Sequence, residues 1–438
     1  MSDSPRELDL VLVGATGFVG RLTAHHLAES APEGLRIGLA GRSLTRLQRL
    51  SRELPEGARG WPLIPVDTTD PDECAALAAR TRVIATTVGP YLRLGAALVA
   101  ACAEAGTHYA DLTGETLFVH RSIAANHETA RASGARIVHA CGFDSVPSDL
   151  GVLLCAEAAR ADGAELGRTR LAVKAMKGGF SGGTVDSGRT QAAELRADPA
   201  ARRAVADPWA LADGGRPPRP VPTVTSEAGA ASSGGLVDRL PAPVAGLVGR
   251  AVKASPVRRQ PDTGRFTGPF VMAEFNSRVV ARSASMLGYG AGFRYGEFSD
   301  FGPGVKGAVN ASVTSAALLG VVAGMSFAPT RPVLDRLLPK PGEGPSAETM
   351  RSGRFRMEVT AEATNGSRYR AVVGAPYDPG YGGTAVMLGQ AALALCEDGD
   401  RLPDAAGVLT PATGIGLTLA ERLREHGFTL DVGPIPTR

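Results

Sequence analysis

Residues 10–42 read LVLVGATGFVGRLTAHHLAESAPEGLRIGLAGR and carry the strongest fold signal in the chain. Leu10 to Val13 form a short apolar run, as expected for a strand buried on both faces. The glycines that follow at the spacing G-x-x-G-x-x-G allow a tight turn, close approach of backbone N–H groups to a pyrophosphate, and a helix lying near the strand. The stretch therefore predicts a dinucleotide site. Seven residues of the turn are expected to contact the cofactor: Gly14, Ala15, Thr16, Gly17, Phe18, Val19 and Gly20.

The second predicted strand, residues 35–40, indicates which dinucleotide binds. It is followed by Gly41, Arg42 and Ser43, where NAD-binding proteins usually place an acid for the ribose 2′-hydroxyl. No acid stands there, whereas Arg42 offers a planar cation suited to a 2′-phosphate and Ser43 offers a hydroxyl. The pair favours NADP(H) over NAD(H). The alternative is that Arg42 is an ordinary surface residue at the start of a helix over 44–53.

The first third of the chain alternates between apolar runs and helical patterns. Strands are predicted at 61–66, 82–88, 107–112 and 136–140, and helices at 71–79, 92–105 and 117–133. Such alternation is typical of a doubly wound parallel sheet with helices on both faces. The sequence therefore predicts an α/β protein whose residues 1–147 form a Rossmann-like NADP-binding domain.

The pattern changes after this domain and predicts a second, α+β domain on a mixed sheet over 148–400. A helix is expected at 148–161, with Ser148 as its N-cap and Asp149 in its first turn. Strands are expected at 171–176, 270–281, 355–363 and 367–373, and helices at 384–395 and 414–426. Residues 196–268 are expected to form an irregular excursion with one short helix at 243–253. The helix 414–426 is allowed to return to the first domain.

Composition excludes several classes of function. The formal net charge is +3 and no block of lysine or arginine occurs, so no nucleic-acid partner is expected. The five cysteines show no C-x-x-C spacing, which indicates neither a disulfide framework nor a metal site. The first ten residues, MSDSPRELDL, do not resemble a secretory signal. A cytoplasmic protein is expected.

The segment 307–330 contains no charged residue. It is rich in Ala, Ser, Thr and Gly and lacks the sustained Leu, Ile and Phe content that favours membrane insertion. A buried helix or an oligomer contact, such as a homodimer interface, is the favoured interpretation. Contact with a membrane or lipid surface is the alternative.

Polar residues gather at the ends of the predicted strands, where open α/β sheets bind ligands. Asp67 follows the third strand and TTVGPY, residues 86–91, follows the fourth. We expect four residues of these loops to contact the cofactor: Asp67, Val88, Gly89 and Pro90. Tyr91 could act near the nicotinamide as a proton donor, or could simply pack in a turn.

Two aspartates follow the next strands of the same sheet. Asp111 could orient a tyrosine or act as a base, and it could equally cap the following helix. Asp144 lies in CGFDSVPSD, residues 141–149, and is expected to point into the same crevice. Tyr91, Asp111 and Asp144 are therefore the candidate catalytic residues.

Other enzyme classes lack support in the sequence. None of the seven tyrosines is followed four residues later by lysine, as the mechanism of short-chain reductases requires. The chain also contains no H-E-x-x-H, no G-x-S-x-G and no Walker lysine, the motifs of common hydrolases and nucleotide kinases.

The motifs together resemble those of the saccharopine dehydrogenase-like oxidoreductases. The N-terminal ones are GATGFVG at 14–20, AGR at 40–42, VGPY at 88–91, ACAEAGTHYADLTGE at 101–115 and GFDSVPSDLG at 142–151. Three more, SGGT at 181–184, PGEGPS at 341–346 and PGYGGTA at 379–385, are similar to the actinobacterial trans-acting enoyl reductases. The resemblance extends over nearly the whole chain.

The resemblance implies an NADPH-dependent reductase that acts on an acyl or polyketide chain held by a carrier protein or synthase. One alternative is a saccharopine dehydrogenase-like enzyme acting on a C–N bond, for which Lys174, Lys177 and Arg189 could bind amino-acid carboxylates. The other is a non-catalytic, lipid-associated protein that retains the nucleotide-binding fold, with 307–330 as its contact surface.

Overall fold

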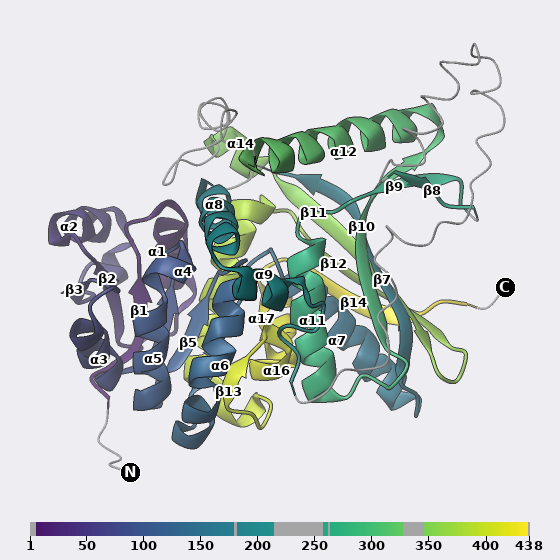
Figure 1. The fold of residues 1–438 in the computed structure, drawn as a ribbon. Coiled ribbons are helices and arrows are strands. Elements are labelled where there is room, and N and C mark those ends of the chain that lie inside the picture. Colours follow the sequence, from purple (N-terminus) through teal and green to yellow (C-terminus); the bar gives the residue numbers. More distant parts are fainter. Residues whose placement is uncertain (1–5, 179–181, 214–256, 262, 327–345, 437–438) are drawn as a thin grey trace.

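A computed structural model describes residues 6–178, 182–213, 257–261, 263–326 and 346–436. The chain folds around two seven-stranded sheets that lie side by side, with helices packed around and between them (Figure 1). The N-terminal elements surround the first sheet, and most of the later elements surround the second. The predicted α/β class, with a second part built on a mixed sheet, is confirmed.

The first sheet is entirely parallel and has the order β13-β6-β5-β4-β1-β2-β3. Its strands are β1 (Leu8–Val13), β2 (Ile37–Gly41), β3 (Leu63–Pro65), β4 (Thr81–Thr86), β5 (His108–Asp111), β6 (Arg136–Val138) and β13 (Gly407–Leu409). All six residues of β1 are buried, because helices cover both faces of the sheet. The order reverses at β1, so ligands are expected beyond its carboxyl end.

The helices of this half follow the predictions closely. They are α1 (Phe18–Ser30), α2 (Leu44–Glu53), α3 (Pro71–Ala79), α4 (Tyr91–Leu94), α5 (Ala96–Ala105) and α6 (Thr116–Ser133), with a 3-10 turn, η1, at Glu56–Ala58. The single helix predicted over 92–105 is wrong, since Gly95 separates α4 from α5. A Cβ on Gly95 would lie 2.9 Å from the ring of Phe118, so glycine is needed where this connection meets α6.

The C-terminal part of the chain returns to the first sheet. Strand β13 pairs with β6 at its edge, and α15 (Thr384–Glu397) packs against α1 and the strands β1, β4 and β5. The predicted helix 414–426 is α17 (Leu417–Glu425), preceded by α16 (Pro411–Gly414). Just after α17, the ring of His426 contacts His26 of α1. Two short turns complete this region: η4 (Pro379–Gly383) and η5 (Gly399–Arg401).

The second sheet is mixed, with the order β14-β12-β11-β7-β10-β9-β8. Its strands are β7 (Leu166–Lys177), β8 (Arg258–Arg259), β9 (Arg265–Gly268), β10 (Arg294–Pro303), β11 (Arg354–Ala363), β12 (Arg368–Ala375) and β14 (Thr429–Pro434). Only β7 and β10 run parallel to each other. Helices α7 (Val146–Ala161) and α11 (Ala273–Leu287) pack against this sheet.

The strand predicted at 270–281 is wrong, because these residues start a turn and continue into α11. Phe275 and Val279 are buried four residues apart, which is helical spacing. Arg278 and Arg282, also one turn apart, are buried as well and donate to the backbone carbonyls of Val205, Leu211 and Val408. These two buried arginines interrupt the apolar face of the helix in the sequence, so its helical period could not be recognised.

Two further predictions need correction. Ser148 lies inside α7, which begins at Val146 with Ser145 at the N-cap position, whereas Asp149 is in the first turn as predicted. The predicted excursion at 196–268 contains regular structure at both ends: the end of α8 (Gly182–Ala197) and α9 (Pro199–Ala206), then β8 and β9. The short helix predicted at 243–253 lies outside the described residues.

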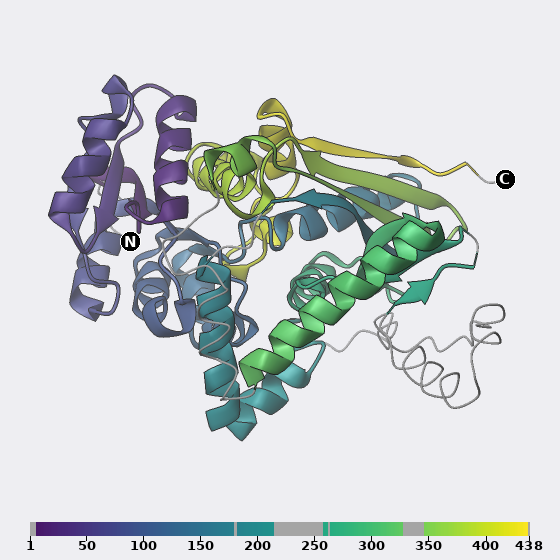
Figure 2. The ribbon, with the colours of Figure 1, turned by 90° about the horizontal axis from the view of Figure 1, so that it is seen from above.

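The uncharged segment 307–330 falls largely in α12 (Gly304–Ser326), a long helix that packs on β9 and β10 (Figures 1 and 2). It is not the buried helix that was predicted, since Val309 and Val313 are exposed. Within the described part of the chain, no helix combines the length and apolar character needed to cross a membrane. A short helix, α14 (Ala347–Arg351), precedes β11.

Candidate active site

The glycine turn connects β1 to α1 at the carboxyl edge of the first sheet. Gly14 has a φ of +80°, and its N–H donates to the carbonyl of Ala40, which fixes the turn beside β2. A Cβ on Gly20 would lie 2.1 Å from the carbonyl oxygen of Gly14, so α1 can approach the turn only with glycine there. The turn therefore leaves room for a pyrophosphate at the start of α1.

A cavity of about 1250 Å³ opens from this turn and extends to the second sheet. Eleven predicted cofactor residues line it: Gly14, Thr16, Gly17, Phe18, Val19, Gly20, Arg42, Asp67, Val88, Gly89 and Pro90. Ala15 and Ser43 do not line it. Ala15 is buried, and the Ser43 hydroxyl accepts a hydrogen bond from the backbone N–H of Arg46 as the N-cap of α2.

Two arginines stand at the end of the cavity beside β2. Arg42 and Arg46 are both exposed and both line the cavity, and Arg46 also borders an adjoining hollow of about 230 Å³ with Arg21 and Arg49. Nearby, N–H and hydroxyl donation from Thr69 holds the pKa of Asp67 below its usual value, with a smaller contribution from the charge of Arg42. This end of the cavity suits a 2′-phosphate.

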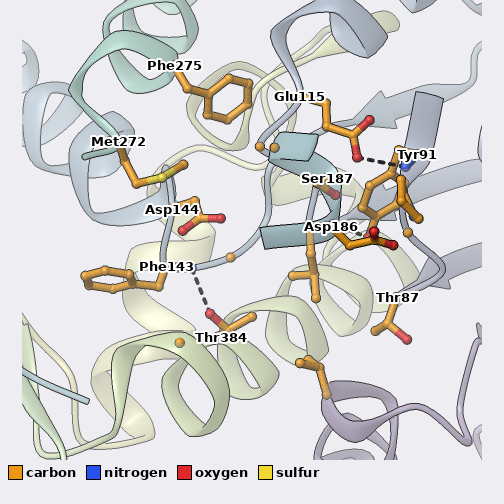
Figure 3. A pocket seen from close by; sticks show the side chains of 18 of the residues that line it. Thr87, Tyr91, Glu115, Phe143, Asp144, Asp186, Ser187, Met272, Phe275 and Thr384 are labelled. Carbon is orange, nitrogen blue, oxygen red and sulfur yellow. Dashed lines mark hydrogen bonds between the residues drawn. The ribbon is translucent and has the colours of Figure 1, made fainter. Parts of the chain in front are cut away.

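Tyr91 lies at the end of β4, where its ring forms part of the cavity wall (Figure 3). Its hydroxyl donates to the carbonyl of Thr86 over 3.2 Å and accepts from the N–H of Leu112 over 3.2 Å. Burial raises the pKa of Tyr91 well above its usual value. The hydroxyl thus joins the ends of β4 and β5 and is a poor acid.

Asp144 projects into the cavity from the loop between β6 and α7, near Met272 and Phe143 (Figure 3). Within the described residues, no group forms a hydrogen bond or ion pair with its carboxylate, and burial raises its pKa to about 6. Its loop is held by the N–H of Phe143, which donates to Thr384, and by the hydroxyl of Ser145, which donates to Asn276. Asp144 is therefore an acid in a fixed position that keeps its proton up to about pH 6.

Comparison with known proteins identifies the family. The chain is 44% identical over 439 residues to a protein of Mycobacterium tuberculosis that carries the name trans-acting enoyl reductase, and the match covers 98% of both chains. Trans-acting enoyl reductases of Mycobacterium bovis and Mycobacterium ulcerans are 41% and 40% identical, over 98% of this chain and 99% of theirs. The chain belongs to the trans-acting enoyl reductases.

Two further comparisons place this trans-acting enoyl reductase family within a wider group. Residues 10–138 match the family described as the saccharopine dehydrogenase NADP binding domain. The fold is similar to that of saccharopine dehydrogenase (L-Glu forming) from Saccharomyces cerevisiae, with a TM-score of 0.52 and 12% identity over 98% of this chain and 100% of that one. The resemblance and the cofactor predicted from the sequence are confirmed, and the protein is an NADP-dependent oxidoreductase.

The residues that this enoyl reductase presents fit the cofactor. A Cβ at Gly20, the third glycine of the turn, would fill the space between the turn and α1. Arg42 and Arg46 stand where the 2′-phosphate is expected. Arg46 was missed in the sequence. It lies four residues after Arg42, a spacing that could have indicated a second cation near the first.

Asp111, the remaining catalytic candidate, does not line the cavity. It is fully buried and accepts hydrogen bonds from Tyr109 and from the N–H groups of Thr113 and Ala140, and it lies 2.7 Å from Nδ1 of His139. Ala140 has a φ of +63°, a conformation that side chains rarely adopt. Asp111 therefore holds the turn that leads to Asp144. The structure brings Tyr91 and Asp144 to the cavity and places Asp111 behind it.

Three further residues contribute to the cavity wall: Glu115, Met272 and Phe275. The carboxylate of Glu115 accepts the N–H groups of Tyr91 and Leu92, each over 2.8 Å, and so holds the start of α4. Met272 and Phe275, at the start of α11, form an apolar wall facing Asp144 (Figure 3). The sequence did not indicate these two residues as part of the site, because residues 270–281 were predicted to form a strand.

Proposed function

We propose that this protein uses NADPH to reduce the carbon–carbon double bond of an α,β-unsaturated acyl thioester. The names of its full-length relatives support this reaction, and so does the NADP-binding half of the cavity. The acyl or polyketide chain would be presented by the carrier domain of a synthase. The proposal depends above all on one observation: Asp144, an acid with no partner among the described residues, faces the apolar side chains of Met272 and Phe275 next to the cofactor crevice.

The cofactor, when bound, supplies a hydride to the β-carbon of the enoyl group. The chain contributes the proton. Asp144 in its protonated form donates to the α-carbon as negative charge develops on the thioester, and it then regains a proton from water. Met272 and Phe275 exclude water from the chamber, which keeps the pKa of Asp144 high and limits competing protonation.

The chemistry of the cavity wall favours an acyl substrate over an amino-acid adduct. Among the described residues that line the cavity, the cations are Arg42 and Arg46, both at the cofactor end. Lys174, a candidate for carboxylate binding, instead pairs with Asp300 and Glu358. Lys177 and Arg189 do not line the cavity. A substrate with two or more carboxylates would find no positive charge among the described residues of the chamber.

The proposal is tested by following NADPH oxidation with trans-2-dodecenoyl N-acetylcysteamine thioester and identifying the saturated product by mass spectrometry. Because Asp144 must be protonated, kcat should be level at low pH and fall as the pH rises above about 6. Imine substrates should give no turnover. NADPH oxidation with an imine but not with the enoyl thioester would contradict the proposal.

The assembly of the protein stays a prediction. A homodimer and a cytoplasmic location are expected from the sequence, and sedimentation of the purified protein would measure the first.

A further inference from the structure

The cavity has exposed lining residues at two separate ends. One end carries Arg42 and Arg46, at the cofactor crevice. The other is formed by the end of β7, the start of α11 and the middle of α12, where Met176 is 43% exposed and Val271 is 39% exposed. Since the cofactor occupies the first end, the second end is available for entry of the acyl chain. We call this second opening the substrate mouth.

The outward face of α12 continues from the substrate mouth. Of the large apolar side chains that the structure describes as exposed, Val305, Val309 and Val313 have the highest exposed fractions, 82%, 53% and 62%. They are spaced four residues apart and therefore form one stripe along the helix. Further along the same helix, Ala317 lines the cavity. The stripe thus leads directly to the mouth.

The opposite face of α12 is occupied. Ala311 and Ser315 are buried, and a Cβ on Gly268 of β9 would lie 3.0 Å from the hydroxyl of Ser315. The helix therefore cannot turn its valines toward the sheet without losing this packing. Exposed apolar side chains held in this way indicate an interaction site rather than a loose helix.

The charge on the exposed face of α12 is positive. Lys306 is the only charged residue of α12, and it is exposed next to Val305 at the start of the stripe. No acid in the described residues pairs with it. Lys177 and Arg354, which pair on β7 and β11, face the other side of the sheet from Met176. Glu274, at the same mouth, is paired with Arg278. The surface therefore suits an acidic partner.

Shape and size argue against two other occupants. Helices that lie on membranes carry Trp, Phe or Leu on the apolar face, whereas the described outward face of α12 offers Val, Ala and Ser. The stripe from Val305 to Val313 is about 12 Å long at 1.5 Å per residue. Three valine side chains cover far less than the roughly 800 Å² per partner of a standard interface, so the stripe fits a partner that binds briefly.

We propose that the α12 stripe, with Met176 and Val271 at the mouth, is the docking surface for an acidic acyl carrier domain. This inference rests on the proposed function. A carrier domain holds its acyl thioester on a flexible arm, so it must dock where the arm can enter the chamber, and it must leave after each turnover. An apolar stripe that begins beside Lys306, a lysine with no acidic partner among the described residues, meets both needs.

The experiment compares two substrates that carry the same acyl group, one bound to a carrier domain and one as a free thioester. A trans-2-dodecenoyl group is loaded on the carrier domain of a type I polyketide synthase, and the same group is supplied as the N-acetylcysteamine thioester. The variant is Val309→Asp with Val313→Asp. The matched control is Val432→Asp, which changes another exposed valine, on β14. Melting temperatures verify that each variant is folded.

We expect the double variant to raise KM for the carrier-bound chain by about tenfold or more, as a loss of about 1.4 kcal/mol of binding predicts. Its kcat, and its KM for the free thioester, should match those of the wild type. Val432→Asp should change neither KM. A wild type that turns over the free thioester but shows no preference for the carrier-bound chain would overturn the inference while leaving the proposed function intact.

Two outcomes would identify a different occupant and overturn the inference. The first is a wild-type dimer in sedimentation that the double variant dissociates. The second is binding of the wild type to phosphatidylglycerol vesicles that the double variant abolishes, with equal KM changes for both substrates. Failure of the wild type to reduce the free thioester would instead contradict the proposed function.

Discussion

The loops after β5 and β6 lie one strand apart on the same sheet edge, and each carries an aspartate: Asp111 is fully buried and Asp144 is partly buried. The loop after β5 surrounds Asp111 with donors, namely a tyrosine hydroxyl, two backbone N–H groups and a histidine. The loop after β6 gives Asp144 no described partner and places it in the cavity. Equivalent positions in a sheet therefore produce a structural carboxylate in one loop and a reactive acid in the other, according to the donors around them.

Replacing the acid should have the largest effect. Asp144→Asn removes the proton donor, so kcat should fall by about 10²- to 10⁴-fold, and the decline in kcat above pH 6 should disappear. Asp144→Glu, which keeps a carboxyl group, should retain part of the activity and the pH dependence. Steady-state kinetics across pH 5–8 measures both. A wild-type kcat in Asp144→Asn would show that Asp144 is not the proton donor.

The same variant should not lose stability. Burial raises the pKa of Asp144 from 3.8 to about 6, so the folded state loses stability as the pH rises from about 4 to 6, and the penalty persists at pH 7. Asparagine carries no such penalty. The free energy of unfolding in urea at pH 7 should equal or exceed that of the wild type, by up to about 3 kcal/mol.

Asp111→Ala should show the opposite pattern. It leaves Tyr109, His139 and the N–H of Ala140 without their acceptor in a fully buried site. We expect the free energy of unfolding to fall by about 3–5 kcal/mol. In the fraction that remains folded, the pH dependence of kcat should be unchanged, since Asp144 is still present. A normal stability with an altered pH profile would show that Asp111 acts in the chemistry.

Variants at Arg42 and Arg46 test which end of the cavity holds the adenosine 2′-phosphate. If it lies at these arginines, the loops after β5 and β6 face the nicotinamide. Arg42→Ala and Arg46→Ala should each weaken NADPH binding about tenfold or more, because each removes one charge-assisted contact to the 2′-phosphate. Affinity for NADH should not change. Fluorescence titrations with both dinucleotides measure the difference. Equal losses for NADPH and NADH would place the phosphate elsewhere.

The smallest effect is expected for Tyr91→Phe. The change removes the acceptor of the Leu112 N–H and the donor to Thr86, at a cost of about 1–3 kcal/mol in unfolding free energy. Because this hydroxyl holds strand ends and its pKa is raised, kcat should stay within about threefold of the wild type. A much larger loss in kcat, at normal stability, would make Tyr91 a second proton donor.

The sequence predicted the first sheet well because its strands are buried on both faces and therefore appear as continuous apolar runs. It could not show which of Asp111 and Asp144 is the acid that faces the cavity. The roles of these residues depend on His139 and Tyr109 in one case and on Met272 and Phe275, about 130 residues further along the chain, in the other.

Two further features could not be predicted for related reasons. Arg278 and Arg282 interrupt the apolar face of α11, and only their backbone acceptors explain why they are buried. The stripe on α12 has the composition of a buried helix, and its exposure follows from the packing of Ala311 and Ser315 on β9 and β10.

Strand β13 has a consequence for how the protein is made. It pairs with β6 at one edge of the first sheet, yet it follows β6 by about 270 residues. During synthesis the edge of β6 therefore stays unpaired until the ribosome has passed residue 409. A fragment that ends at residue 147 would keep this edge exposed permanently and should aggregate, so the half that binds the cofactor cannot be produced as an independent module.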